Sequence, residues 1–239
     1  MIVTRSHVIT GKATLKEMAS YLLKRAFDIV AASMLLLVLL PILLLIAFLI
    51  RHDSAGSPLF IQQRVGSRRR VRNGKVVWEV RNFPCFKFRT MYTNADQKLH
   101  QEHVKKFVRG ELEAGEQGAD TAKFKLDRDP RITRIGHILR RTSLDELPQL
   151  LNVLRGEMSL IGPRPVPTYE VAEYDTWHFL RLAALPGISG LWQVKGRSQV
   201  SFEEMVELDV EYVRQQSLLF DIKIMLLTVL VMINGSGAR

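Results

Sequence analysis

The longest apolar stretch of the chain lies near the N-terminus and contains no charged residue. It covers residues 29–50 and reads IVAASMLLLVLLPILLLIAFLI. As a straight helix this stretch would be about 33 Å long, which is enough to cross a bilayer. It exceeds the apolar core of a secretory signal peptide, which is roughly 7–15 residues, and no small-residue cleavage site follows it. We therefore expect residues 29–50 to be retained and embedded in a membrane.

Two features of this apolar segment argue against a simple crossing helix. Pro41 lies past its middle, where a proline removes one backbone hydrogen bond and bends a helix. Both flanks are basic, and positive charge marks the cytoplasmic side, so both ends are favoured there. A kinked hairpin that enters and leaves by the same face satisfies both observations. An ordinary crossing helix with a tolerated proline is the alternative.

Two further segments have the pattern of helices at a membrane surface. Apolar positions recur at helical spacing over residues 14–27, with basic residues on other faces. Residues 218–233 are strongly apolar but contain Asp221 and Lys223, and they are short for a crossing helix. We expect both segments to be interfacial. The alternatives are packing on the protein's own core for the first and a second crossing helix for the last.

The region after the apolar segment predicts a mixture of strands and helices. Residues 58–61 form a short strand, and the basic run at 68–75 is a turn that contains Asn-Gly at 73–74, a strong hairpin signal. Residues 96–109 have a polar helical pattern. The acidic, glycine-rich residues 110–120 predict a mobile loop.

A short alternating stretch, Phe86-Lys87-Phe88-Arg89, predicts a strand with two different faces. The period of two places Phe86 and Phe88 toward the core and Lys87 and Arg89 together on the other face. Two neighbouring cations suit a phosphate, although two exposed cations on a strand are more often only solvated.

The C-terminal third predicts three further elements. Residues 170–184 contain Trp177 among apolar positions and fit an interfacial helix with an aromatic anchor, with core packing as the alternative. Residues 186–193 predict a loop followed by a strand. Residues 201–215 predict a helix that begins with a capping box.

The composition restricts the partners of the protein. The chain has 239 residues, of which 47% are hydrophobic, so a disordered chain is excluded. Its 34 Lys and Arg exceed its 24 Asp and Glu, and the net charge of +10 predicts an anionic partner. That partner is nucleic acid, an anionic membrane surface or a phosphorylated substrate. The lone cysteine, Cys85, excludes an internal disulfide and a cysteine-rich zinc site.

The candidate site lies in residues 127–165. Two adjacent carboxylates, Asp145 and Glu146, follow Arg140 closely and precede Arg164 of a Gly-Pro-Arg-Pro turn. Planar guanidinium groups bind phosphate oxygens with two hydrogen bonds. Carboxylates beside a phosphate site indicate a bound metal ion or covalent phosphoryl chemistry.

A structural interpretation of the same residues is also available. Ser143 and Glu146 have the spacing of a capping box, although Pro148 would remove a bond from that helix. A capped helix start also binds phosphate, so the two interpretations are compatible. Adjacent helical residues project about 100° apart, which suits Asp145 and Glu146 to two different tasks.

Eight sequence motifs occur in a fixed order along the chain. They are KRAFDIV, the proline-broken apolar segment, PLFIQQRVG, FKFRTM, DPRITRIG, SLDELPQLLNVLRGEMSLIGPRP, PGISGLWQVKGR and DIKIMLLTV. With these motifs the chain resembles the bacterial sugar transferases, or monotopic phosphoglycosyl transferases. The resemblance covers about residues 24–233, and the long SLDELPQ to GPRP block is its most specific part. Leu40 stands before Pro41 where many relatives have Ser, which leaves the exact bend open.

The resemblance implies an α-rich α/β, membrane-associated monotopic fold with an N-terminal re-entrant helix hairpin and interfacial amphipathic helices. The expected parts are an interfacial segment over 1–28, the membrane hairpin over 29–50 and a catalytic domain over 51–239. The expected location is the bacterial cytoplasmic (inner) membrane, with the catalytic domain on its cytoplasmic face.

The resemblance also implies an activity. A sugar-1-phosphate passes from a nucleotide diphosphosugar to polyprenol (undecaprenyl) phosphate, and a nucleoside monophosphate is released. This would be the first membrane step of a surface polysaccharide or glycoconjugate pathway, such as exopolysaccharide or lipopolysaccharide biosynthesis. The expected partners are these two substrates and membrane lipid, and not nucleic acid.

The resemblance assigns roles to individual residues. Asp145 is the nucleophile and forms an aspartyl phosphosugar, while Glu146 serves a Mg²⁺ site. Arg140 and Arg164 handle phosphate, and Lys87, with Arg89 beside it, occupies the basic positions of the KFR motif.

Two functions of other classes compete with this interpretation. A membrane-anchored nucleic-acid-binding regulator would use the positive charge, but no helix-turn-helix or aromatic stacking platform is recognisable. A non-enzymatic membrane scaffold would leave the acid pair as a helix cap. Dependence of activity on Asp145 separates the enzyme from both.

Overall fold

The computed structural model describes residues 2–4, 6–93, 96, 98–111, 129–196 and 200–233. The strands are β1 (Ile2–Val3), β2 (His7–Lys12), β3 (Leu59–Arg72), β4 (Lys75–Phe88), β5 (Ser159–Ile161), β6 (Val166–Pro167) and β7 (Gly187–Ser189). The α-helices are α1 (Leu15–Asp53), α2 (Lys98–Val108), α3 (Arg134–Thr142), α4 (Leu150–Arg155), α5 (Thr168–Val171), α6 (Leu191–Lys195), α7 (Phe202–Gln215) and α8 (Leu218–Ile233). Two 3₁₀ helices are η1 (Leu144–Gln149) and η2 (Thr176–Leu182). The structure is therefore a mixed α/β fold.

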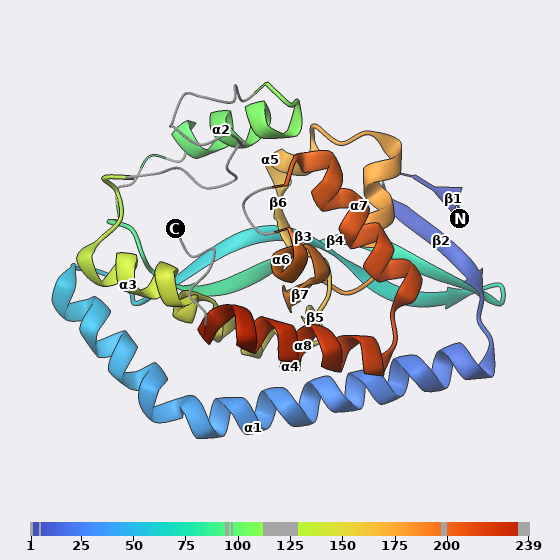
Figure 1. The fold of residues 1–239 in the computed structure, drawn as a ribbon, viewed down its shortest axis with the longest axis horizontal. Helices are drawn as coiled ribbons and strands as arrows, with labels where there is room; N and C mark the ends of the chain where they lie inside the picture. The colour runs from blue at the N-terminus through green and yellow to red at the C-terminus, as the bar shows by residue number, and fades with distance from the viewer. Residues whose placement is uncertain are drawn as a thin grey trace.

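A long antiparallel hairpin forms the centre of the sheet (Figure 1). Strands β3 and β4 pair from Leu59 opposite Phe88 to Arg72 opposite Lys75, within the order β1-β2-β4-β3-β6. The predicted hairpin is confirmed, because its tip is Asn73-Gly74, with φ of 50° and 68°. The expected basic turn is shorter than predicted. The turn has only two residues, so the arginines before it belong to β3.

The apolar segment and the segment before it form a single helix, α1. A capping box between Thr14 and Glu17 starts this helix, and Pro41 lies inside it. Figure 1 shows that α1 changes direction in its apolar half. By length and composition α1 can cross a membrane, and only 11% of its most apolar window is buried. The helix predicted over 14–27 is thus continuous with the apolar segment, with no break at residue 28.

The first leg of α1 is attached to the catalytic region by buried charges. Lys24 pairs with Asp221 of α8 at 2.5 Å and donates to the carbonyl of Ile161 at 3.2 Å. Asp28 accepts the backbone N–H of Leu160 at 3.1 Å. Arg25 donates to carbonyls near the end of α4. These contacts hold α1 beside β5, α4 and α8.

The second leg of α1 returns to the same body. Ile46 and Ile50 are buried against Phe88 and Leu139. The Asp53 carboxylate accepts the backbone N–H of residue 135 in α3 at 3.1 Å. Both ends of the apolar helix are therefore anchored to one catalytic region.

The C-terminal third differs in part from the predictions. Residues 170–184 include η2, and Phe179 and Leu182 are buried in the main core, so the alternative of core packing describes this segment. After β7 the chain enters helix α6 at Leu191, where a strand was expected. Helix α7 begins with the predicted capping box of Ser201 and Glu204.

The remaining helical predictions have mixed outcomes. The helix expected over 218–233 is α8, with the same bounds. The polar helix expected over 96–109 is α2, Lys98–Val108. Most of the expected loop over 110–120 lies outside the described residues.

Candidate active site

The acid pair lies at the start of η1, directly after a sharp turn of the chain. Ser143 has φ of 56° and ends α3, since its backbone N–H donates to the carbonyl of Leu139. The predicted capping box is wrong, because Ser143 makes no side-chain cap bond to η1. A residue in the left-handed conformation closes the preceding helix, whereas an N-cap needs an extended backbone. Asp145 and Glu146 are therefore positioned by the end of α3.

Glu146 lies between two cations that come from distant parts of the sequence. Its Oε1 is 3.0 Å from Nζ of Lys87 on β4 and 3.1 Å from a guanidinium nitrogen of Arg164. The three side chains are only 14–20% exposed. The burial of Phe86 and Phe88 confirms the alternation that turns Lys87 toward this site. The structure thus brings together three of the predicted site residues.

Asp145 lies in the same group of charges. Burial raises the pKa of its carboxyl, the charge of Lys87 opposes that increase, and Glu146 adds to it. The charges of Arg140 and Arg164 also lower the pKa, so both guanidinium groups are close. A carboxylate with a raised pKa is a better nucleophile than an ordinary aspartate.

Arg140 reaches the site from α3. Its Nε donates to Oγ1 of Thr90 at 2.9 Å, which orients the guanidinium. Burial lowers the pKa of Arg140, and the charge of Asp145 gives the largest opposing effect. Arg140 therefore lies close enough to Asp145 for their charges to interact, and its assignment to phosphate stays a prediction.

Arg89 has a different environment from Lys87. It follows the last residue of β4 and is only 6% exposed. Its guanidinium donates to the carbonyls of Ser54 and Ala55, each at 2.6 Å. Gly56 has φ of +116°, and a Cβ there would collide with this guanidinium. Arg89 thus fastens the end of α1, and its assignment to substrate phosphate stays a prediction.

The sequence predicted no role for two residues near the site, although both lie within motifs of the family resemblance. Asn152 of α4 donates to the carbonyl of Pro84 at 2.7 Å and accepts the N–H of Phe86 at 3.0 Å, so it joins α4 to β4. Arg64 of β3 lies close enough to Arg164 for the charge of Arg164 to lower its pKa, after burial itself. Both depend on tertiary contacts that local patterns do not encode.

The donor chemistry of the acid pair fits a hard cation. Among the described residues there is no group of three or more His, Cys, Asp or Glu that could hold a metal ion. Mg²⁺ is commonly bound by one or two carboxylates, with waters and substrate phosphates completing its shell. Asp145 and Glu146 supply two such carboxylates.

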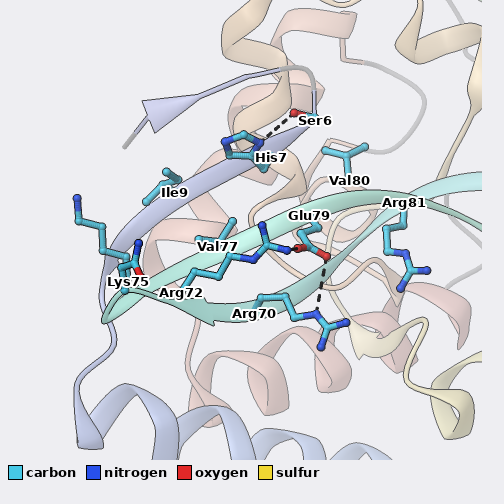
Figure 2. Close-up of a pocket in the computed structure, with 11 residues that line it drawn as sticks. Ser6, His7, Ile9, Arg70, Arg72, Lys75, Val77, Glu79, Val80 and Arg81 are labelled. Carbon is cyan, nitrogen blue, oxygen red and sulfur yellow. Dashed lines mark hydrogen bonds and ion pairs between the residues drawn. The ribbon is translucent and has the colours of Figure 1, made fainter.

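A hollow of about 740 Å³ lies elsewhere, on β2 and the β3–β4 hairpin. Figure 2 shows Arg70, Arg72, Lys75 and Arg81 around it, with Glu79 among them. Glu79 pairs with Arg72 at 2.5 Å and with Arg70 at 3.7 Å. None of the acid-pair residues lines this hollow, so we locate the active site by its chemistry.

Comparison with known proteins shows the family of the chain. The family model described as bacterial sugar transferase matches residues 19–235. The chain belongs to the bacterial sugar transferase family. The match includes α1 from residue 19 onward, the acid pair and the cations around it.

Three relatives show the range of this family. A UDP-galactose-lipid carrier transferase of Erwinia amylovora is 43% identical over 225 residues, covering 94% of this chain and 43% of that protein. The exopolysaccharide production protein ExoY of Rhizobium meliloti is 42% identical over 206 residues, covering 86% of this chain and 83% of that protein. The undecaprenyl-phosphate galactose phosphotransferase of Salmonella typhimurium is 40% identical over 225 residues, covering 94% of this chain and 43% of that protein. The chain spans less than half of the first and third relatives and most of the second.

Proposed function

We propose that this sugar transferase moves a sugar-1-phosphate from a nucleotide diphosphosugar to polyprenol phosphate and releases a nucleoside monophosphate. The observation that carries the proposal is the partly buried pair Asp145-Glu146 beside Lys87, Arg140 and Arg164. Such a group suits phosphoryl transfer, because it supplies a nucleophile and cations for phosphate oxygens. The names of two relatives, a lipid carrier transferase and an undecaprenyl-phosphate phosphotransferase, support it.

The first step is an attack by a carboxylate oxygen of Asp145 on the β-phosphorus of the donor. A bond forms between this oxygen and phosphorus, and the bond from phosphorus to the bridging oxygen breaks. The bridging oxygen leaves with its electron pair on the nucleoside monophosphate. In the second step, an oxygen of the lipid phosphate attacks the same phosphorus and releases the Asp145 carboxylate. No proton is required in either displacement, since both nucleophiles are anions.

The cations reduce the repulsion between these anions. Arg164 and Lys87 are held on Glu146, so they are oriented before substrate binds. Burial alone would lower the pKa of Arg164, but the two carboxylates outweigh it and raise that pKa. Arg164 therefore keeps its charge throughout the reaction. Cations oriented in advance stabilise the transition state at little cost in reorganisation.

Mg²⁺ is part of the proposal. Glu146, with Asp145 beside it, would hold the ion, and the bound ion would neutralise charge on the diphosphate. We expect EDTA to stop nucleotide release and added Mg²⁺ to restore it. Release that persists at full rate in EDTA would remove the ion from the proposal.

The membrane arrangement follows from α1. We propose that α1 re-enters the membrane, bending at Pro41, and that the catalytic region lies on the cytoplasmic face of the inner membrane. The attachment of both legs of α1 to one catalytic body supports this, because a crossing helix would separate its ends. A polyprenol phosphate would then present its head group on the side of the acid pair. The product would enter a surface polysaccharide pathway, as the name of the ExoY relative suggests.

The test is release of nucleoside monophosphate by the purified, detergent-solubilised protein. The donors are a panel of nucleotide diphosphosugars with Mg²⁺, with and without polyprenol phosphate. We expect one donor to give a burst equal to the enzyme concentration without lipid, and turnover with lipid. Asp145→Asn should lose both, while Asp96→Asn at an exposed position should keep both.

Each failure has a distinct meaning. Release that needs the lipid even for the first turnover would replace the covalent intermediate by direct transfer. Release that survives in Asp145→Asn would remove Asp145 as the nucleophile. No release with any donor would favour the non-enzymatic scaffold.

A further inference from the structure

Within the described residues, Arg64 of β3 is a partly buried cation that forms no ion pair with an acid, and it differs from Arg89 in not being fastened to the end of α1. We propose that Arg64 forms a second phosphate subsite, which binds a substrate phosphoryl group other than the one that is attacked. This inference rests on the proposed function and extends it. The phosphate belongs either to the nucleotide portion of the donor or to the lipid acceptor.

The position of Arg64 is determined by the sheet. On β3 it lies opposite Phe83 of β4 on one side and Pro167 of β6 on the other. One terminal guanidinium nitrogen donates to the carbonyl of Pro165 at 3.3 Å. That carbonyl belongs to the residue after Arg164, so the two guanidinium groups share one region. Arg64 is thereby directed toward the active site.

Apart from its bond to Pro165, Arg64 donates no side-chain hydrogen bond within the described residues. Its Nε is buried and has no hydrogen-bond partner, and Arg64 makes no ion pair in the described part of the chain. Burying a cation without an acid is costly, so a purely structural position would favour an apolar side chain. The remaining N–H groups suit a ligand with several oxygens, and a phosphate is such a ligand.

The charges near Arg64 include a cation and an acid. Burial lowers the pKa of Arg64 most, the charge of Arg164 lowers it further, and the charge of Glu170 raises it by less than the charge of Arg164 lowers it. With Lys87 and Arg140, the two guanidinium groups place four cations around the two carboxylates of the acid pair. The group is therefore two charges positive within the described residues. A diphosphate or a lipid phosphate would balance this excess.

Two aromatic side chains continue the same region away from the acid pair. Tyr169 of α5 meets His100 of α2 edge to face, with ring centroids 6.2 Å apart. Burial lowers the pKa of His100 to about 4, and the next contribution is the charge of Arg64. His100 is consequently neutral at pH 7 and adds no charge near Arg64.

The first experiment measures binding without turnover. Magnesium pyrophosphate is titrated into the solubilised protein, and the shift in thermal unfolding gives its dissociation constant. We expect Arg64→Met to raise this constant about tenfold to hundredfold, which is the range for one or two charge-assisted hydrogen bonds. Arg64→Lys should recover part of the loss, since it keeps the charge. Arg68→Met, at an exposed position on the same strand, should match wild type.

The second experiment identifies the source of the phosphate. Steady-state rates are measured for wild type, Arg64→Met and Arg64→Lys, with donor and lipid varied in turn. A raised KM for the donor alone assigns the subsite to the nucleotide phosphate, and a raised KM for the lipid alone assigns it to the acceptor. Wild-type pyrophosphate affinity in both Arg64 variants would overturn the proposal. Weakened pyrophosphate binding in a protein with no turnover would refute the proposed function and leave the subsite standing.

Discussion

Asp145 and Glu146 are neighbours in sequence but have opposite surroundings. Glu146 is held by Lys87 and Arg164, whereas Asp145 makes no hydrogen bond or ion pair within the described parts of the chain. Burial raises the pKa of Asp145, so its charged form is disfavoured in the fold. Among the described residues, the Asp145 carboxylate therefore has no partner to reduce its nucleophilicity, whereas Glu146 connects Lys87 and Arg164 through its two ion pairs.

This contrast predicts opposite effects on stability. The folded pKa of Asp145 is raised, so its carboxyl stabilises the fold only at low pH, and that contribution is lost as pH rises through the folded pKa. At pH 7 we expect Asp145→Asn to keep or increase the free energy of unfolding. Glu146→Gln should lower it by about 1–3 kcal/mol, because two partly buried cations lose their acceptor. Denaturant unfolding in detergent at pH 7 provides the measurement, and equal losses in the two variants would contradict the assignment.

The acidic limb of the pH–rate profile is a second prediction for Asp145. In the proposed mechanism activity requires the ionised form of Asp145, so kcat/KM should fall with decreasing pH at a higher pH than for an ordinary aspartate. After burial, the largest effect on this pKa is the lowering by Lys87. Lys87→Gln should therefore raise the pKa of Asp145 and move the acidic limb to higher pH, whether or not the maximal rate also falls. Arg68→Gln serves as the control, and an unmoved limb in Lys87→Gln would show that another group titrates.

At the scale of elements, α1 differs most from a simple interpretation of hydropathy. Its apolar residues are exposed along most of the helix, as expected in a membrane. Its two legs nevertheless contact the catalytic region through Lys24 and Asp53. The contacts at the two ends of α1 therefore constrain its membrane topology more than the length of the helix does.

The topology of α1 can be tested with two cysteines. Lys12→Cys and Ser57→Cys lie at exposed positions on either side of α1, and the one native cysteine, Cys85, is buried. For a re-entrant helix, a membrane-impermeant maleimide should label both from the cytoplasmic side and neither from outside intact cells. Labelling of the two positions from opposite sides would establish a crossing helix. The wild-type protein gives the background from Cys85.

At the scale of the whole molecule, buried ion pairs connect the membrane helix to the catalytic region. Lys24 is 6% exposed and Asp221 is 2% exposed, and Tyr212 also donates to Asp221 at 2.8 Å. This cluster joins α1, α7 and α8. Its loss would weaken the attachment of the first leg of α1 to the body that contains the acid pair.

We expect Lys24→Met to lower the free energy of unfolding by about 3–5 kcal/mol, because it leaves Asp221 buried and unpaired. The Lys24→Met/Asp221→Asn double variant should recover part of this loss, since the charge of Asp221 is removed together with that of Lys24. Lys16→Met changes an exposed lysine of the same helix and should have little effect. An equal effect in Lys24→Met and Lys16→Met would show that the pair contributes little.

The sequence by itself determined the features that depend on local periodicity and turn chemistry. It predicted the apolar membrane segment, the Asn73-Gly74 hairpin, the capped start of α7 and the bounds of α8, because these signals lie within a few residues. Its long motif block also identified the acid pair and the arginines that accompany it.

Only the tertiary structure decided how these parts meet. It joined Glu146 to Lys87 and Arg164, directed Arg89 to the end of α1 and placed Arg64 beside the site. The cap expected at Ser143 failed for the same reason, since the end of one helix determined the start of the next. Contacts between distant residues depend on sheet register and helix packing, and no local pattern encodes either.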